Sequence, residues 1–125
     1  MFGFRRANNS GAAPTIKQIA ANSAVTYHVG DALVLTSGKA ALAGSTVKPE
    51  YIAAQGGLGI NTLSAYQVNG DQEYETVLAE TGAVVVGTKV TLSSSNSITT
   101  TTTNGVAEVV SVAGTAAGSA AVVKF

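Results

Sequence analysis

Short apolar and β-branched runs, separated at regular intervals by turn residues, extend over most of this chain from residue 24 onward. The first region places such runs at residues 24–29, 32–36 and 39–43, with Gly30-Asp31 and Ser37-Gly38 between them. Runs of about five residues divided by glycine turns are typical of strands in small antiparallel folds. The pattern therefore predicts an all-β fold, either a small antiparallel β-barrel or a sandwich.

The last quarter of the sequence carries the clearest hairpin pattern. A β-branched run at residues 98–103 leads into Asn104-Gly105, a pair that readily takes positive φ at both central positions of a type I′ turn. Residues 106–113 return as a second strand, residues 114–118 form a looser reversal, and residues 120–125 form a third strand. We expect a β-branched substitution at Gly105 to destabilise the fold because it opposes positive φ.

A second Asn-Gly pair, Asn69-Gly70, lies between residues 60–68 and 73–79 and predicts another hairpin. Asp71, Glu73 and Glu75 alternate along the second of these segments, which places them on one face of a strand. A calcium site needs a longer ligand set, and a glycosidase needs two carboxylates that face each other across a cleft. A solvated edge that blocks unwanted sheet pairing fits the three acids better.

A short internal repeat relates two parts of the chain. Val29-Gly30-x-x-Leu33-x-Leu35-Thr36-Ser37 aligns without gaps with Val86-Gly87-x-x-Val90-x-Leu92-Ser93-Ser94. The second copy belongs to the apolar segment at residues 82–92, which predicts a strand, a turn and a strand. The repeat marks either two similar strand-turn-strand units or two halves of one barrel.

The N-terminal residues differ from this pattern. Residues 1–14 have no strand or helix periodicity, whereas residues 15–22 have helical spacing that fits a short helical turn, and an extended segment fits them nearly as well. We therefore divide the chain into an N-terminal arm at residues 1–23 and a single β domain at residues 24–125. The arm concentrates anchor-type side chains, and we expect these to bind a partner: Phe2, Phe4, Arg5 and Arg6. Removing residues 1–14 is expected to leave the β domain folded.

Composition narrows the function. Charged residues are 11% of the chain with a net charge of zero, which disfavours binding to nucleic acid, and no segment is apolar enough to span a membrane. Cysteine is absent, so disulfides and thiolate metal sites are excluded. His28 is the one histidine and has no nucleophile or ligand partner nearby in sequence, so no catalytic triad can be assembled. We expect no enzyme activity, no cofactor and no metal.

Several segments together resemble the head decoration proteins of tailed bacteriophages. They are G-D-A-L-V-L from Gly30, E-Y-E-T from Glu73, V-V-V-G-T-K-V-T-L from Val84, N-G-V-A-E-V from Asn104, and the A-G-x-x-A-V-V-K-F ending. The resemblance implies a small structural β protein on the exterior of the virion, made in the host cytoplasm. Its partner would be the major capsid protein, and it would form a homo-oligomer, with a trimer expected.

Two alternatives stay open. One is a receptor- or carbohydrate-binding β module of a phage tail or fibre, which needs an exposed aromatic platform such as Tyr51 with Tyr74. The other is a small hydrolase or metal enzyme.

Overall fold

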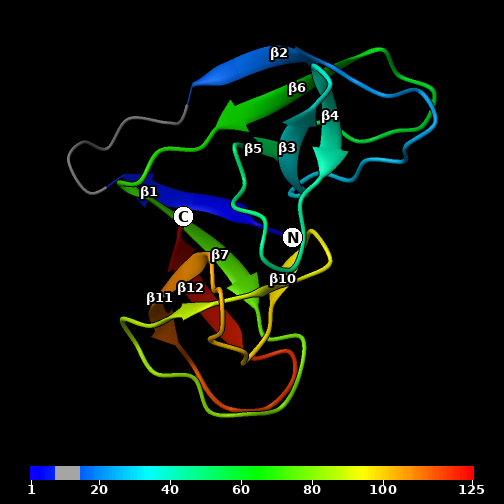
Figure 1. The fold of residues 1–125 in the computed structure, drawn as a ribbon. Coiled ribbons are helices and arrows are strands. Elements are labelled where there is room, and N and C mark those ends of the chain that lie inside the picture. The colour runs from blue at the N-terminus through cyan, green and yellow to red at the C-terminus, as the bar shows by residue number, and fades with distance from the viewer. Residues whose placement is uncertain (8–14) are drawn as a thin grey trace.

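The computed structural model describes residues 1–7 and 15–125, and this part of the chain is all-β with antiparallel sheets (Figure 1). The predicted fold class is therefore confirmed, as a sandwich-like pair of sheets with no closed barrel. The strands are β1 (Gly3–Ala7), β2 (Ile16–Ala20), β3 (Ala32–Thr36), β4 (Lys39–Leu42), β5 (Tyr51–Ala53), β6 (Thr62–Gln67), β7 (Gln72–Val77), β8 (Lys89–Val90), β9 (Leu92–Ser93), β10 (Ser97–Ile98), β11 (Ala107–Val112) and β12 (Ala120–Lys124).

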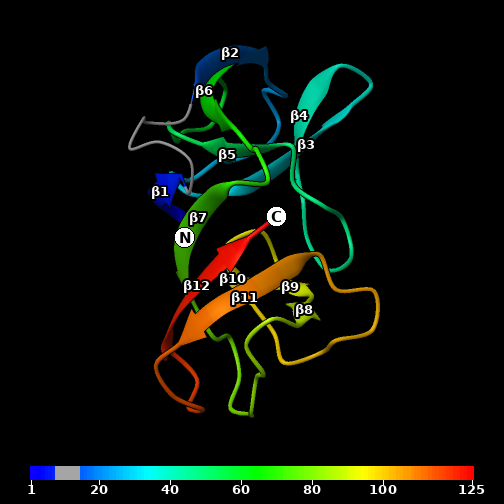
Figure 2. The same ribbon diagram turned by 90° about the vertical axis from the view of Figure 1, so that its left-hand side faces the viewer.

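The strands form two five-stranded sheets and a two-stranded ribbon. The order is β2-β6-β5-β3-β4 in the first sheet and β1-β7-β12-β11-β8 in the second, while β9 pairs with β10. Figure 2 shows the first sheet above the second, with β1 and the upper part of β7 at the level where the two sheets meet. Backbone hydrogen bonds between Ser45 and Leu92, of 3.2 and 2.9 Å, join the two parts of the chain.

The two sheets are built by an internal duplication that the short sequence repeat only partly reveals. We call residues 15–68 the first half and residues 72–125 the second half. The pairing of β2 with β6 recurs as β7 with β12, that of β5 with β6 as β11 with β12, and that of β3 with β5 as β8 with β11. β3, which also pairs with β4, corresponds to β8 followed by β9, which pairs with β10.

The duplication extends to turns and to single hydrogen bonds. Gly30 and Gly87 have φ of 87° and 89°, and Ser37 and Ser94 have φ of 51° and 53°. The Ala21 amide donates to the Asn61 carbonyl at 2.9 Å, and the equivalent Leu78 amide donates to Ser119 at 3.0 Å. The aligned residues are therefore two structural halves, each with a sheet of its own.

Each half also repeats the positions that fill its core. Full burial of a valine, leucine or isoleucine side chain stabilises the folded state by about 1.5–3 kcal/mol. Six core positions of the first half correspond to buried positions of the second: Ala21 and Leu78, Leu33 and Val90, Ala40 and Ile98, Ala53 and Val109, Leu63 and Ala121, and Ala65 and Val123. Side-chain size differs within these pairs, since in five of the six one half has an alanine and the other has a larger aliphatic residue.

Both Asn-Gly hairpins predicted from the sequence are wrong. β11 pairs with β12 and β8, so residues 98–103 do not form its partner strand, although the reversal into the strand at residues 120–124 is confirmed. Asn104 has φ of 56° while Gly105 is not in the positive region, so the turn is not type I′. Asn69-Gly70 instead carries the chain from β6 in the first sheet to β7 in the second.

Other expected strands are shorter or absent. Residues 24–29 contribute one bridge, between Tyr27 and Gly57, and residues 82–92 contain only β8 and the start of β9. The extended alternative for residues 15–22 is confirmed by β2.

The proposed N-terminal arm is also wrong for its described residues. β1 pairs with β7, and β2 pairs with β6, so both are sheet strands. Residues 8–14, which the arm included, lie outside the described part of the chain. The division that the structure shows is therefore between the first half, residues 15–68, and the second half, residues 72–125.

Candidate binding surface

A hollow lies on the outer face of the second sheet. It has a volume of about 620 Å³ and is formed by β7, β11 and β12, with Met1 at its rim. Its lining is mostly aliphatic: Met1, Glu75, Thr76, Val77, Ser111, Val112, Ala113, Ala120, Ala121 and Val122. We call this surface the outer groove. Met1 is 63% exposed and Val77 is 40% exposed, so apolar side chains here contact solvent.

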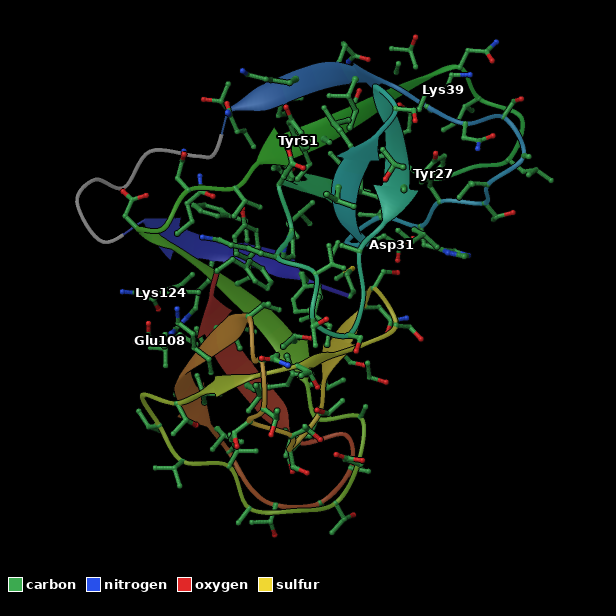
Figure 3. All side chains as sticks on the ribbon, in the orientation of Figure 1. Tyr27, Asp31, Lys39, Tyr51, Glu108 and Lys124 are labelled. Atoms are coloured by element: carbon green, nitrogen blue, oxygen red, sulfur yellow. The ribbon has the colours of Figure 1, made fainter. Side chains whose placement is uncertain are left out.

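A charged pair lies beyond one end of the outer groove. Alternation along β12 places Lys124 on the same face as Ala120 and Val122. The register puts Glu108 of β11 opposite Lys124, and Figure 3 shows the two residues near each other at the side of the second sheet. A partner that covers the outer groove with apolar side chains would therefore contact charged side chains at this end.

The same face of the first sheet has different chemistry. Glu75, Ala120 and Val122 of the second half correspond to Gln18, Thr62 and Ser64 of the first. The Gln18 amide Nε2 donates to Ser64 Oγ at 2.6 Å, so polar side chains here satisfy one another. At the two positions on β12, Ala120 and Val122, the second half is therefore aliphatic where the first half has Thr62 and Ser64.

β1 and the residue before it, Phe2, pack against the second half through three of the four predicted binding residues. Phe2 is 1% exposed and its ring meets Phe125 edge-on, with centroids 5.2 Å apart. Phe4 meets Tyr74 in the same manner at 6.0 Å. Phe2 therefore fills the protein's own core, and it is not an exposed anchor.

Arg5 occupies a bulge in β1 and faces two carboxylates of β7. Its guanidinium lies 3.4 Å from Glu73 Oε1 and 3.6 Å from Glu75 Oε1, and its side chain is 41% exposed. Such partly exposed pairs contribute little to stability, about 1 kcal/mol or less each. The side chain of Arg6, the fourth predicted residue, lies outside the described part of the structure.

The acidic edge expected at β7 is wrong, because β7 lies between β1 and β12. Glu73 is 1% exposed, whereas Glu75 is exposed beside the outer groove and Asp71 is half-buried. Sequence alternation placed Glu73 and Glu75 on one strand correctly, whereas Asp71 precedes that strand, and the alternation could not show that a strand from the N-terminus pairs with β7.

The aromatic platform expected from Tyr51 and Tyr74 does not form. Tyr74 is fully buried and its hydroxyl donates to Gln72 Oε1 at 2.7 Å. Burial raises the pKa of the Tyr74 phenol well above its ordinary value, and nearby Tyr66 adds to this shift. Tyr51 is half-buried and lines a smaller hollow of about 450 Å³, together with Lys48, Pro49, Glu50, Gln67, Val68, Gly70 and Phe125.

The region around the single histidine has a structural role. The Asp31 carboxylate accepts a hydrogen bond from the His28 amide at 2.8 Å and lies 3.6 Å from its Nδ1. Figure 3 shows Asp31 at the base of the first half, below Tyr27. Across residues 1–7 and 15–125, His, Asp and Glu side chains form no group of three suited to a metal ion. The same residues contain no helix long and apolar enough to cross a membrane.

The outer groove was missed from sequence, although a pattern for it exists. Val77, Val112 and Val122 occupy outward or rim positions on strands where polar residues would be expected. Recognising them requires the register, since a shift of one residue exchanges the two faces.

Comparison of the chain with protein-family models, with curated proteins and with solved structures finds no match.

Proposed function

We propose that this chain is a structural protein of a tailed-phage virion that binds major capsid protein subunits on the outer surface of the head. The proposal is supported by the resemblance of its strand segments to head decoration proteins. The observation that carries it within the molecule is the aliphatic outer groove. In this proposal the chain has no catalytic role, and its oligomer, expected to be a trimer, assembles on the capsid exterior.

The physical case for the outer groove is that exposed aliphatic surface is costly in water and stabilises a complex when it is covered. An aliphatic partner side chain that is fully buried there contributes about 1.5–3 kcal/mol. A trimer that binds several capsid sites at once gains avidity, so modest affinity per subunit suffices for a dense coat. Charged residues limit which partner surfaces fit the outer groove. They are Glu75 beside the groove and the Glu108 and Lys124 pair beyond its end.

A matched pair of substitutions tests this function. Ala120→Glu places a carboxylate on the rim of the outer groove, and Thr62→Glu places the same group at the equivalent exposed position of the first half. Each variant is mixed with expanded, undecorated heads, and the bound fraction is measured by sedimentation. We expect at least about tenfold weaker binding for Ala120→Glu, equivalent to one buried charge without a partner, and unchanged binding for Thr62→Glu. Equal binding by both variants would contradict the proposal.

The alternative function, a receptor- or carbohydrate-binding module of a tail or fibre, is favoured by one observation. The smaller hollow combines a half-buried tyrosine, Tyr51, with the polar side chains of Lys48, Glu50 and Gln67. Sugars stack on aromatic rings and hydrogen-bond to such groups. Glycan binding that is lost in Tyr51→Ala but kept in Ala120→Glu would favour this alternative over the capsid.

A further inference from the structure

Along Ile16–Ala20, the outer edge of the first sheet at β2 has no strand paired to it within residues 1–7 and 15–125, and β4 meets this edge only at its end, where Ala21 bridges Ala40. The equivalent edge of the second sheet, at β7, is covered by β1. Figure 1 shows β2 along the outer rim of the first half and β1 alongside β7. The duplication therefore presents one occupied and one open copy of the same edge.

Hydrogen bonding shows which backbone groups the open edge presents. Thr15 accepts from the Gln67 amide and Ala21 donates to Asn61, both at 2.9 Å, so alternate residues of β2 face β6. Three residues therefore direct their amides and carbonyls away from β6: Ile16, Gln18 and Ala20. In the second half the matching residues are Glu73, Glu75 and Val77, and the first two are those that register with β1.

The two edges differ in the side chains that a docking strand meets. At β7 the strand β1 places Phe4 opposite Tyr74 and Arg5 beside Glu73 and Glu75. At β2 the position of Tyr74 is taken by Lys17, and that of Glu73 by Ile16, which is 57% exposed. A strand like β1 would therefore bring an aromatic ring to an ammonium group and a guanidinium to an isoleucine.

We propose that the open edge of β2 is a docking site for an extended segment of a partner protein, paired antiparallel and carrying an acidic side chain opposite Lys17 and an apolar one beside Ile16. Addition of a strand to a sheet edge supplies backbone hydrogen bonds, while alternate side chains supply selectivity. Because β1 has the opposite pattern, the chain's own N-terminal strand is directed to β7 and away from β2. The proposal does not depend on the capsid role.

A tethered segment tests the proposal in the full chain. A copy of residues 1–7 carrying Phe4→Glu and Arg5→Leu is joined in front of Met1 through a Gly/Ser linker of about 15 residues, which raises its local concentration to the millimolar range. A second protein carries the unmodified copy on the same linker. Amide hydrogen exchange is then measured by NMR. We expect at least about tenfold slower exchange of the Ile16 and Gln18 amides with the modified segment only.

Two features keep the result interpretable. The Lys17 and Ile19 amides already bond to β6, so their exchange serves as an internal reference. Gln18→Pro removes an outward amide that β6 does not use, and should abolish the protection, whereas Gln18→Thr should retain it. Protection by both segments, protection by neither, or protection in the chain without a tether that increases with protein concentration would each overturn the proposal, the last by identifying a second copy as the occupant.

Discussion

The first and second halves share strand pairing, turn geometry and core positions, yet they differ at outward positions and at one sheet edge. The first half has polar side chains at Gln18, Thr62 and Ser64 on its outer face, and its edge along Ile16–Ala20 is open. The second has an aliphatic outer groove and an edge covered by β1. Because the backbone is common to both, these differences come from side chains and from one added strand. They teach that core pattern fixes the fold of each half, while outward positions are free to specialise.

The halves also differ in how a core hydroxyl, that of Tyr27, is used. In the first half the Tyr27 hydroxyl accepts from the Asn22 amide at 2.9 Å and donates to the Ala40 carbonyl at 2.7 Å. In the second half the corresponding Ala79 amide bonds directly to Ile98 at 2.8 Å. The tyrosine thus adds a large side chain to a core in which four of the eight buried residues are alanines.

The largest expected effect removes the ring by which β1 joins the second half. Phe2→Ala deletes a side chain that is 1% exposed and packs on Phe125, and such changes cost about 3–5 kcal/mol of unfolding free energy. Chemical denaturation measures the loss. It should be accompanied by faster amide exchange in β7 than in β2. An unchanged stability would restore the unfolded arm expected from sequence, and deletion of residues 1–14 would then be harmless.

The next effect concerns the close approach of two backbone segments in the second half. A Cβ at Gly105 would lie 2.2 Å from the Lys89 carbonyl oxygen, so Gly105→Ala forces the strands apart and should cost about 1–3 kcal/mol. The sequence argument reached the same direction through positive φ, which this residue does not have. Gly118→Ala is the control, because Gly118 has a φ of 88° but an added Cβ there would have no atom within 4 Å. Comparable losses in thermal melts of both variants would show that close approach is not the cause.

A smaller effect separates the two cores. Tyr27→Phe leaves the Asn22 amide and the Ala40 carbonyl without the hydroxyl between them, at a cost of about 1–2 kcal/mol. Amide exchange should accelerate in the first half and stay unchanged in the second, where the direct bond needs no tyrosine. Uniform acceleration of both halves would mean that they unfold only as one unit.

The smallest effect is a pH dependence confined to the second half. Thr100 donates to Glu80 Oε1 from its amide at 2.9 Å and its hydroxyl at 2.8 Å, and these bonds lower the pKa of the Glu80 carboxyl. Since the folded pKa is below the unfolded one, the stabilisation is complete above about pH 4.5 and is lost as pH falls through the folded pKa. An NMR titration of the carboxyl checks this. A midpoint at or above 4.5 would contradict it.

Local patterns in the sequence predicted the elements whose partners are close along the chain. Ser37-Gly38 joins β3 to β4, as the alternating pattern indicated, and the small residues at 114–118 join β11 to β12. The Asn-Gly pairs marked reversals correctly but not the receiving strand, because that strand is chosen by packing across the chain. The burial of Phe2 and the outer groove were beyond prediction for the same reason. Both depend on contacts with residues far away in sequence.

The edge-on contact between Phe2 and Phe125 has a consequence for folding during synthesis. All five strands of the first sheet are supplied by residues 16–67, so it can close while the ribosome is still making the second half. The second sheet needs both β1, which is translated before the first sheet, and β12, which is translated after it. Phe2 therefore stays exposed until Phe125 has been made. During that interval a chaperone would find an exposed phenylalanine ahead of an already folded sheet.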